Sequence, residues 1–140
     1  MHSSSEKYTV LIVDDNPANL GMLTSYLKEY GYKTPIARNG EIALQRAKYI
    51  QPDIILLDVV MPGLDGLETC RRLKANDATR DIPIIFMTAL DGTEDKLLGF
   101  EVGGVDYVTK PFQQEEVLAR VATHVRIREL TQHLQKQTAQ

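Results

Sequence analysis

The sequence contains almost no cysteine and no long apolar run. Cys70 is the single cysteine among 140 residues, so an intrachain disulfide and a disulfide-stabilised secreted scaffold are excluded. No segment approaches the roughly 20 apolar residues that a membrane span needs, and the polar start at 1–7 is not a signal peptide. We therefore expect a soluble, cytoplasmic protein that does not bind membranes, with a disordered N-terminus over residues 1–7.

Excess positive charge is missing as well. The formal net charge is -3 and the pI is about 5.6, whereas proteins that bind nucleic acid through its phosphates usually carry a basic surface. Direct nucleic-acid binding is therefore not expected. A length of 140 residues with 43% hydrophobic residues suits one globular domain with a substantial core.

Short continuous apolar runs predict strands that are buried on both faces of a parallel sheet. They cover residues 10–13, 53–57, 82–87 and 105–109. The weaker segment 33–37 predicts an edge strand, because Pro35 cannot donate a hydrogen bond to a strand ladder.

Helical periodicity fills the segments between these runs. Asn16 and Pro17 predict the start of the first helix and Gly31 its end. Further helices are expected over 39–49, 67–75 and 93–102 and after Phe112. Strands that alternate with helices predict an α/β fold, a doubly wound five-stranded parallel sheet flanked by five helices, the last of which is extended.

The residues that follow four of the strands have related chemistry. They are three acids, one hydroxyl and one amine: Asp14, Asp15, Asp58, Thr88 and Lys110. Because parallel strands end at one edge of a sheet, and ligands bind there where the strand order reverses, we expect these side chains to share one pocket.

Such a pocket favours phosphoryl chemistry. Two unit charges about 4 Å apart repel by roughly 4 kcal/mol at an effective dielectric constant near 20, so clustered carboxylates take up protons or a cation. Oxygen ligands without His or Cys select Mg²⁺. Asp58 could attack phosphorus as a nucleophile while Lys110 and Thr88 bind the phosphoryl oxygens.

From about Lys7 to Arg128 the chain resembles the receiver domains of bacterial two-component response regulators. The matching motifs are VLIVDDN (10–16), LDVVMPGLDG (57–66), MTA (87–89) and DYVTKPF (106–112). The resemblance implies a flavodoxin-like sheet of strand order 2-1-3-4-5 and a cis peptide bond between Lys110 and Pro111.

The resemblance also implies roles for individual residues. Asp58 would be the phosphoacceptor, and Mg²⁺ would bind Asp15, Asp58 and the backbone carbonyl of Val60, with Asp14 acting mainly through a metal-bound water. Thr88 and Lys110 would contact the phosphoryl group. Tyr107 would be the switch aromatic, which turns inward and reshapes the surface formed by the fourth helix, fifth strand and fifth helix.

Family likeness further implies partners and an activity. The phosphoryl donor would be the phosphohistidine of a sensor histidine kinase or a phosphotransfer protein. The switched surface would control an output domain beyond the C-terminus or a separate partner. Such a domain is not a conventional enzyme, although it catalyses its own phosphorylation and dephosphorylation.

The C-terminal residues extend beyond the expected receiver domain, which we assign to 8–126, with 127–140 as a helical extension or linker. Ile127, Leu130, Leu134 and Gln137 have the spacing of a short coiled-coil seam. A solvated terminal helix is the alternative. A homodimer could form through this helix or through the switched surface. Cys70 is expected in the core, and His124 and His133 on the surface.

The motifs fit three other functions less well. A haloacid-dehalogenase-type phosphatase needs a second Asp two residues after its nucleophile, where this chain has Asn16 after Asp14. A nucleotide-binding module needs a glycine-rich turn after the first strand, which is acidic here. A receiver-like domain that only binds partners would not require the complete acidic pocket.

Overall fold

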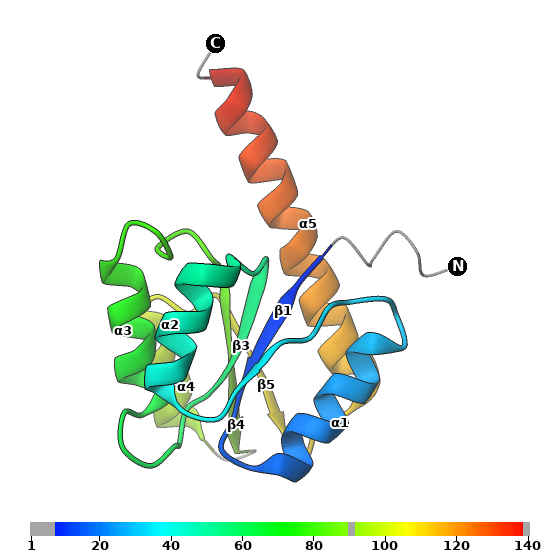
Figure 1. Cartoon of the computed structure of the whole chain (residues 1–140), viewed down its shortest axis with the longest axis vertical. Helices are drawn as coiled ribbons and strands as arrows, with labels where there is room; N and C mark the ends of the chain where they lie inside the picture. The colour runs from blue at the N-terminus through cyan, green and yellow to red at the C-terminus, as the bar shows by residue number, and fades with distance from the viewer. Residues whose placement is uncertain (1–7, 90–91, 139–140) are drawn as a thin grey trace.

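The computed structural model describes residues 8–89 and 92–138 and contains a single parallel five-stranded sheet, in the order β2-β1-β3-β4-β5 (Figure 1). The expected disorder of residues 1–7 lies outside the described residues. The strands are β1 (Val10–Val13), β2 (Ile36–Ala37), β3 (Ile54–Asp58), β4 (Ile84–Ala89) and β5 (Asp106–Lys110). The helices are α1 (Pro17–Lys28), α2 (Gly40–Ile50), α3 (Gly66–Ala75), α4 (Thr93–Glu101) and α5 (Gln114–Thr138). The predicted fold and strand order are confirmed.

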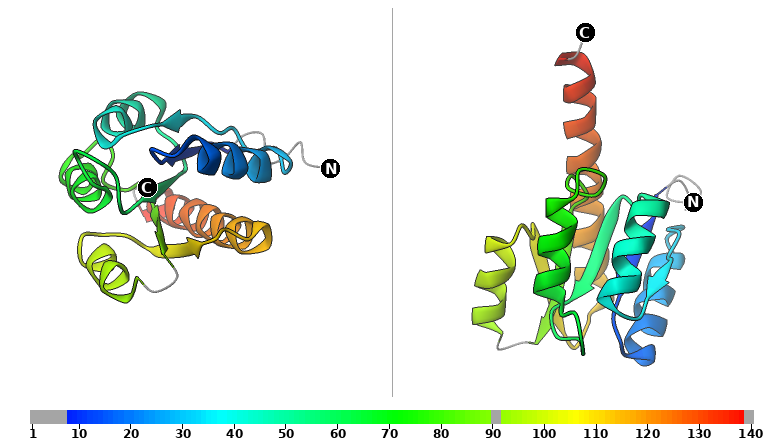
Figure 2. Two further views of the ribbon diagram at one scale, coloured as in Figure 1. Left: turned by 90° about the horizontal axis from the view of Figure 1, so that it is seen from below. Right: turned by 60° about the vertical axis from the view of Figure 1, so that its left-hand side comes forward.

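Helices cover both faces of the sheet. In the left view of Figure 2, α1 and α5 lie on one side and α2, α3 and α4 on the other. Two apolar clusters correspond to these layers, one joining the sheet to α1 and α5 and the other joining it to α2 and α3. Cys70, on α3, is fully buried in the second cluster, as predicted. This double covering explains why the strand sequences are continuously apolar.

Side-chain caps fix where three helices begin. The Asn16 side chain accepts hydrogen bonds from the amides of Ala18 and Asn19, and Pro17 occupies the first turn of α1. Asn39 caps α2 and Asp65 caps α3 in the same manner. Each cap satisfies an amide that the helix itself leaves unpaired. All three helices follow a strand of the parallel sheet and so begin next to its carboxyl edge.

Strand β2 is short and lies at the edge of the sheet, as Pro35 predicts. It pairs with β1 through two residues, and a separate bridge joins Thr9 to Lys33. The carbonyl of Pro35 accepts a hydrogen bond from Ile12 although its nitrogen cannot donate one.

Helix α5 continues past the amino edge of the sheet, and its C-terminal turns project from the body of the domain (Figure 1). Before it projects, Arg128 donates to the carbonyls of Pro52 and Asp53, and Glu129 accepts from the Tyr8 hydroxyl. Within residues 8–89 and 92–138, none of the helices has the length and apolar content to cross a bilayer.

The prediction for His124 was wrong. Its side chain is only 14% exposed, and Nε2 lies 3.0 Å from Oδ2 of Asp106. Arg120 contacts the same carboxylate at 3.2 Å. His124 lies on the side of α5 that faces the domain. Its partner, Asp106 on β5, is distant in the sequence, so this contact was not predictable.

Candidate functional site

The register of the sheet brings the predicted acidic residues together. Val13 on β1 is level with Leu57 on β3, so the residues that follow them, Asp14 and Asp58, lie side by side. The strand order reverses between these two strands, since β2 lies on the other side of β1. The site therefore occupies the switch point of the sheet, where open α/β folds bind ligands.

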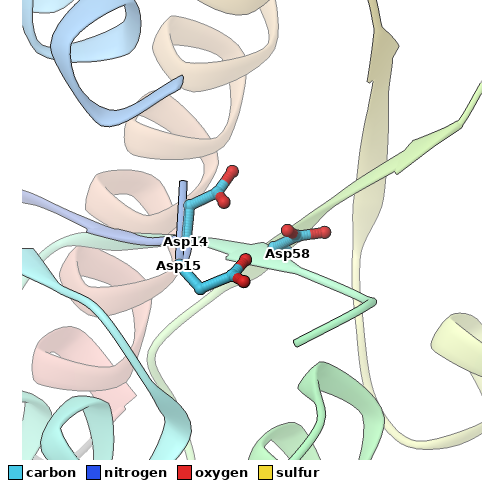
Figure 3. Close-up of side chains that lie close together, drawn as sticks. All are labelled: Asp14, Asp15 and Asp58. Carbon is cyan, nitrogen blue, oxygen red and sulfur yellow. The ribbon is translucent and has the colours of Figure 1, made fainter. Parts of the chain in front are cut away.

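Three carboxylates meet at this point. Asp14, Asp15 and Asp58 each offer an oxygen, and these oxygens lie within 4.8 Å of one another. The side chains extend from the ends of β1 and β3 (Figure 3). Asp14 and Asp58 are buried, at 0% and 2% exposed, whereas Asp15 is exposed. The cluster is thus open to solvent on the side of Asp15.

Asp14 is held in place by the start of α1. Its Oδ1 accepts a hydrogen bond of 2.9 Å from the Asn16 amide, and its Oδ2 accepts one of 3.1 Å from the Asn19 side chain. These two hydrogen bonds fix the direction in which the Asp14 carboxylate points. Sequence reasoning missed Asn19, because its role depends on how α1 leaves the sheet.

Asp58 is the carboxyl group of the site whose pKa is shifted. Lys110 Nζ lies 3.1 Å from Oδ1 of Asp58, and the amide of Val60 donates to the same oxygen at 3.2 Å. Burial and the negative charge of Asp14 raise the pKa of Asp58 to about 6, in opposition to Lys110 and the Val60 amide. A single ammonium therefore leaves the negative charge of the cluster incompletely compensated.

A glycine lets α3 approach the site closely. The Gly66 amide donates to the carbonyl of Val59 at 2.9 Å. A Cβ atom at this position would lie 2.0 Å from the backbone oxygen of Asp58, far inside van der Waals contact. Gly66 thereby determines how the chain folds back after Asp58, although the sequence analysis gave it no role.

Thr88 and Lys110 lie at the adjoining strand ends. In the register of β4 and β5, Ala89 is level with Lys110, and Thr88 directly follows Met87, which is level with Asp58. The Thr88 side chain is buried, and its hydroxyl donates to the Ala89 carbonyl at 3.0 Å. The Lys110–Pro111 bond is cis, as expected.

Tyr107 contacts α4. Its ring packs edge-on against Phe100, with ring centroids 6.1 Å apart, and Lys96 Nζ lies 4.3 Å from the centroid of the Tyr107 ring. A cation above an aromatic face is attracted by the ring quadrupole. Neither partner was identified from the sequence, because α4 shows only weak apolar periodicity.

The site residues fit a hard divalent cation. Carboxylate oxygens are the preferred ligands of Mg²⁺, and a cation would relieve the repulsion that raises the pKa of Asp58. The cluster of Asp14, Asp15 and Asp58 could therefore bind a metal.

This fold and this site define a receiver domain, and comparisons with known proteins agree. Residues 10–122 match the family model of the response regulator receiver domain. The chain belongs to this family and is a receiver domain of the two-component response-regulator type.

Three relatives illustrate the likeness. Response regulator PleD of Caulobacter vibrioides is 42% identical over 93% of this chain and 29% of its own length. A putative response regulator from Chloroflexus aurantiacus has a TM-score of 0.83 at 38% identity, covering 85% of this chain and 98% of that one. The receiver domain of the sensor histidine kinase PA1611 from Pseudomonas aeruginosa was solved with a magnesium ion coordinated in its active site cleft. Its TM-score is 0.79 at 30% identity, covering 84% of this chain and 97% of that one.

Curated relatives are longer than this chain, which spans between about a quarter and a half of their lengths.

Proposed function

We propose that Asp58 accepts a phosphoryl group from the phosphohistidine of a sensor histidine kinase or phosphotransfer protein, and that this reaction switches the domain. The supporting observation is the buried carboxylate of Asp58 at the switch point. Lys110 holds one of its oxygens, and two further carboxylates offer oxygens within 4.8 Å. The residues of this site supply a nucleophile, a cation for the phosphoryl oxygens and a set of metal ligands.

The transfer exchanges one bond to phosphorus for another. An oxygen of Asp58 forms the new O–P bond while the P–N bond to the donor imidazole breaks, and the imidazole leaves with the electron pair. Lys110, already 3.1 Å from Asp58, then binds a phosphoryl oxygen. Positioning and charge stabilisation supply most of the catalysis in reactions of this type.

Asp14, Asp15, Asp58 and the backbone carbonyl of Val60 would hold Mg²⁺. When bound, the ion neutralises negative charge on the phosphoryl oxygens. The magnesium ion in the related PA1611 receiver supports this assignment. Asp14 is oriented by Asn16 and Asn19, so the chain fixes part of the ligand set in advance.

Thr88 and Tyr107 would convert the added charge into a change of shape. A phosphoryl group brings up to two negative charges and three acceptors, and the Thr88 hydroxyl exchanges its bond to Ala89 for one of these oxygens. Tyr107 then leaves its contact with Phe100 and turns inward. The surface of α4, β5 and α5 changes, and an output domain or separate cytoplasmic partner reads it. The equilibrium between the two forms exists beforehand, and phosphorylation biases it.

Intact-mass measurement tests the proposal. The protein is incubated with a small acyl phosphate and Mg²⁺, and we expect the mass of one added phosphoryl group. Asp58→Asn should remove the adduct, whereas the matched variant Asp77→Asn, on an exposed loop, should keep it. Chelation of the metal should slow the reaction. An adduct on the Asp58→Asn protein would contradict the assignment, and steady turnover of an aryl phosphate would instead favour a phosphatase.

A further inference from the structure

The two halves of α5 present apolar residues on opposite sides of the helix. Within the domain, Val121 and Val125 are buried in the core. Leu130 and Leu134 each follow one of these valines by nine residues. At about 100° per residue this separation is two and a half turns, so the two leucines point away from the side that packs on the sheet.

These leucines belong to a stripe that is exposed. Ile127, Leu130 and Leu134 are 50%, 54% and 60% exposed, and Gln137 continues the same alternating spacing of three and four residues. This is the a/d spacing of a coiled coil, with Ile127 and Leu134 at a and Leu130 and Gln137 at d. The stripe begins next to Arg128 and Glu129, which still contact the domain, and continues into the projecting C-terminal turns of α5 (Figure 1).

We propose that this stripe binds the same stripe of a second copy of the chain, forming a parallel, in-register two-stranded coiled coil. In this arrangement Ile127, Leu130 and Leu134 each meet their own counterpart, and the two Gln137 amides can hydrogen-bond to each other. An antiparallel pairing of equal length would instead place Gln137 against Ile127. In the first heptad, isoleucine at a with leucine at d favours two strands over three or four in a parallel coil.

The surroundings of the stripe are compatible with this partner. Arg126 occupies the flanking position g, and Thr131 occupies position e of the next heptad. In a parallel coil, Arg126 of one copy faces Thr131 of the other. No like charges therefore oppose each other at this pair, as they would in a coil selected against self-association. Ile127 lies beside the domain body, where it lines a hollow with Pro83 and Val105, whereas Leu130 and Leu134 face away from the core-facing side of α5.

The coil lies at the opposite edge of the sheet from Asp58, and its formation does not depend on the proposed phosphorylation. The experiments below use no phosphodonor. A failure of the coil is therefore distinguishable from a failure of the phosphorylation assignment, which the mass measurement decides separately.

Sedimentation equilibrium over a range of concentrations is the first test. We expect a concentration-dependent dimer, because the seam is short. Leu130→Glu places two carboxylates face to face at a d position and should return the protein to a monomer. Leu97→Glu is the matched control, since Leu97 is an exposed leucine on α4 outside the stripe, and it should dimerise like the parent. A dimer that Leu97→Glu abolishes and Leu130→Glu spares would overturn the proposal, as would a parent protein that stays monomeric throughout.

Disulfide trapping tests the orientation. The single native cysteine does not compete, because Cys70 is buried and burial raises the pKa of its thiol to about 11. Ile127→Cys should cross-link to itself at least about tenfold faster than Gln132→Cys, because a positions face each other in a parallel coil and f positions face solvent. Equal rates would reject the seam.

An antiparallel coil gives a different product. Two Ile127 positions would then lie about 15 Å apart along the axis, and Ile127→Cys would cross-link instead to Gln137→Cys in a mixture of the two proteins. Preferential formation of that mixed product would overturn the parallel arrangement.

Discussion

Replacing Asp58 by asparagine is expected to stabilise the folded domain near neutral pH in the absence of magnesium. Asp58 is 2% exposed, and burial together with the charge of Asp14 raises its pKa to about 6, against about 3.9 in an unfolded chain. The folded state therefore holds this proton more tightly than the unfolded state. The resulting stabilisation is fully present below about pH 4 and is lost as the pH rises to about 6.

The magnitude follows from the difference between the two pKa values. A difference of about two units, at 1.36 kcal/mol each, corresponds to about 3 kcal/mol of stability lost by charging Asp58 in the folded protein. Asparagine keeps the shape of the side chain without the charge. The Lys110 side chain is 31% exposed, so its ammonium can be hydrated after losing Asp58. We therefore expect a gain of about 2–3 kcal/mol, equivalent to a rise in Tm of roughly 10 °C.

Urea unfolding followed by far-UV circular dichroism measures this gain at about pH 7 and about pH 4. The gain should be large at the higher pH and small at the lower one, where the Asp58 carboxyl of the parent protein is protonated. Asp77→Asn is the control, since its side chain is 87% exposed and it should alter stability by less than about 0.5 kcal/mol. Equal stabilities at neutral pH, or an equal gain at both pH values, would refute the reasoning.

Three further outcomes are expected at the site, and Gly21→Ala on α1 serves as a contrast to one of them. Asp15→Asn should leave the metal-free stability nearly unchanged because Asp15 is exposed, yet reduce the roughly 1.4 kcal/mol that Mg²⁺ at ten times its Kd adds in calorimetry. Gly66→Ala should destabilise the domain by about 1–3 kcal/mol, because its Cβ would overlap the Asp58 carbonyl. Gly21→Ala, with open space around it, should instead stabilise α1 by up to about 1 kcal/mol in the same urea assay. Lys110→Ala should raise the pKa of Asp58 above 6 in an NMR titration, since Lys110 lowers it.

The cluster of acidic residues was predictable because it depends mainly on the backbone. Once the apolar runs are interpreted as parallel strands, the residues after Val13 and Leu57 must emerge at one edge. The structure places Asp14, Asp15, Asp58 and Lys110 together there, as the strand pattern requires. The first strand has the predicted bounds, and the bounds of the other four differ from prediction by at most three residues, which shifted no functional side chain to the other edge.

Contacts that depend on side-chain direction were not predictable in the same way. Asn19 reaches Asp14 only because α1 begins at a particular angle, and His124 finds Asp106 across two elements that are distant in sequence. Lys96 and Phe100 meet Tyr107 through the packing of α4 on β5. Periodicity identifies which face of a helix is apolar, but it does not specify which residue lies opposite across an interface.

Helix α5 connects the proposed site to the proposed coil as one uninterrupted helix. It starts three residues after Pro111 and contains neither proline nor glycine between Gln114 and Thr138, the residues at which helices most often kink. At the carboxyl edge, Glu116 accepts a hydrogen bond from the Thr109 amide, and at the amino edge Arg128 holds two carbonyls. A displacement of β5 at Lys110 would therefore move α5 as one body of about 37 Å. In a dimer joined beyond Ile127, such a movement changes how the two receiver domains are oriented toward each other.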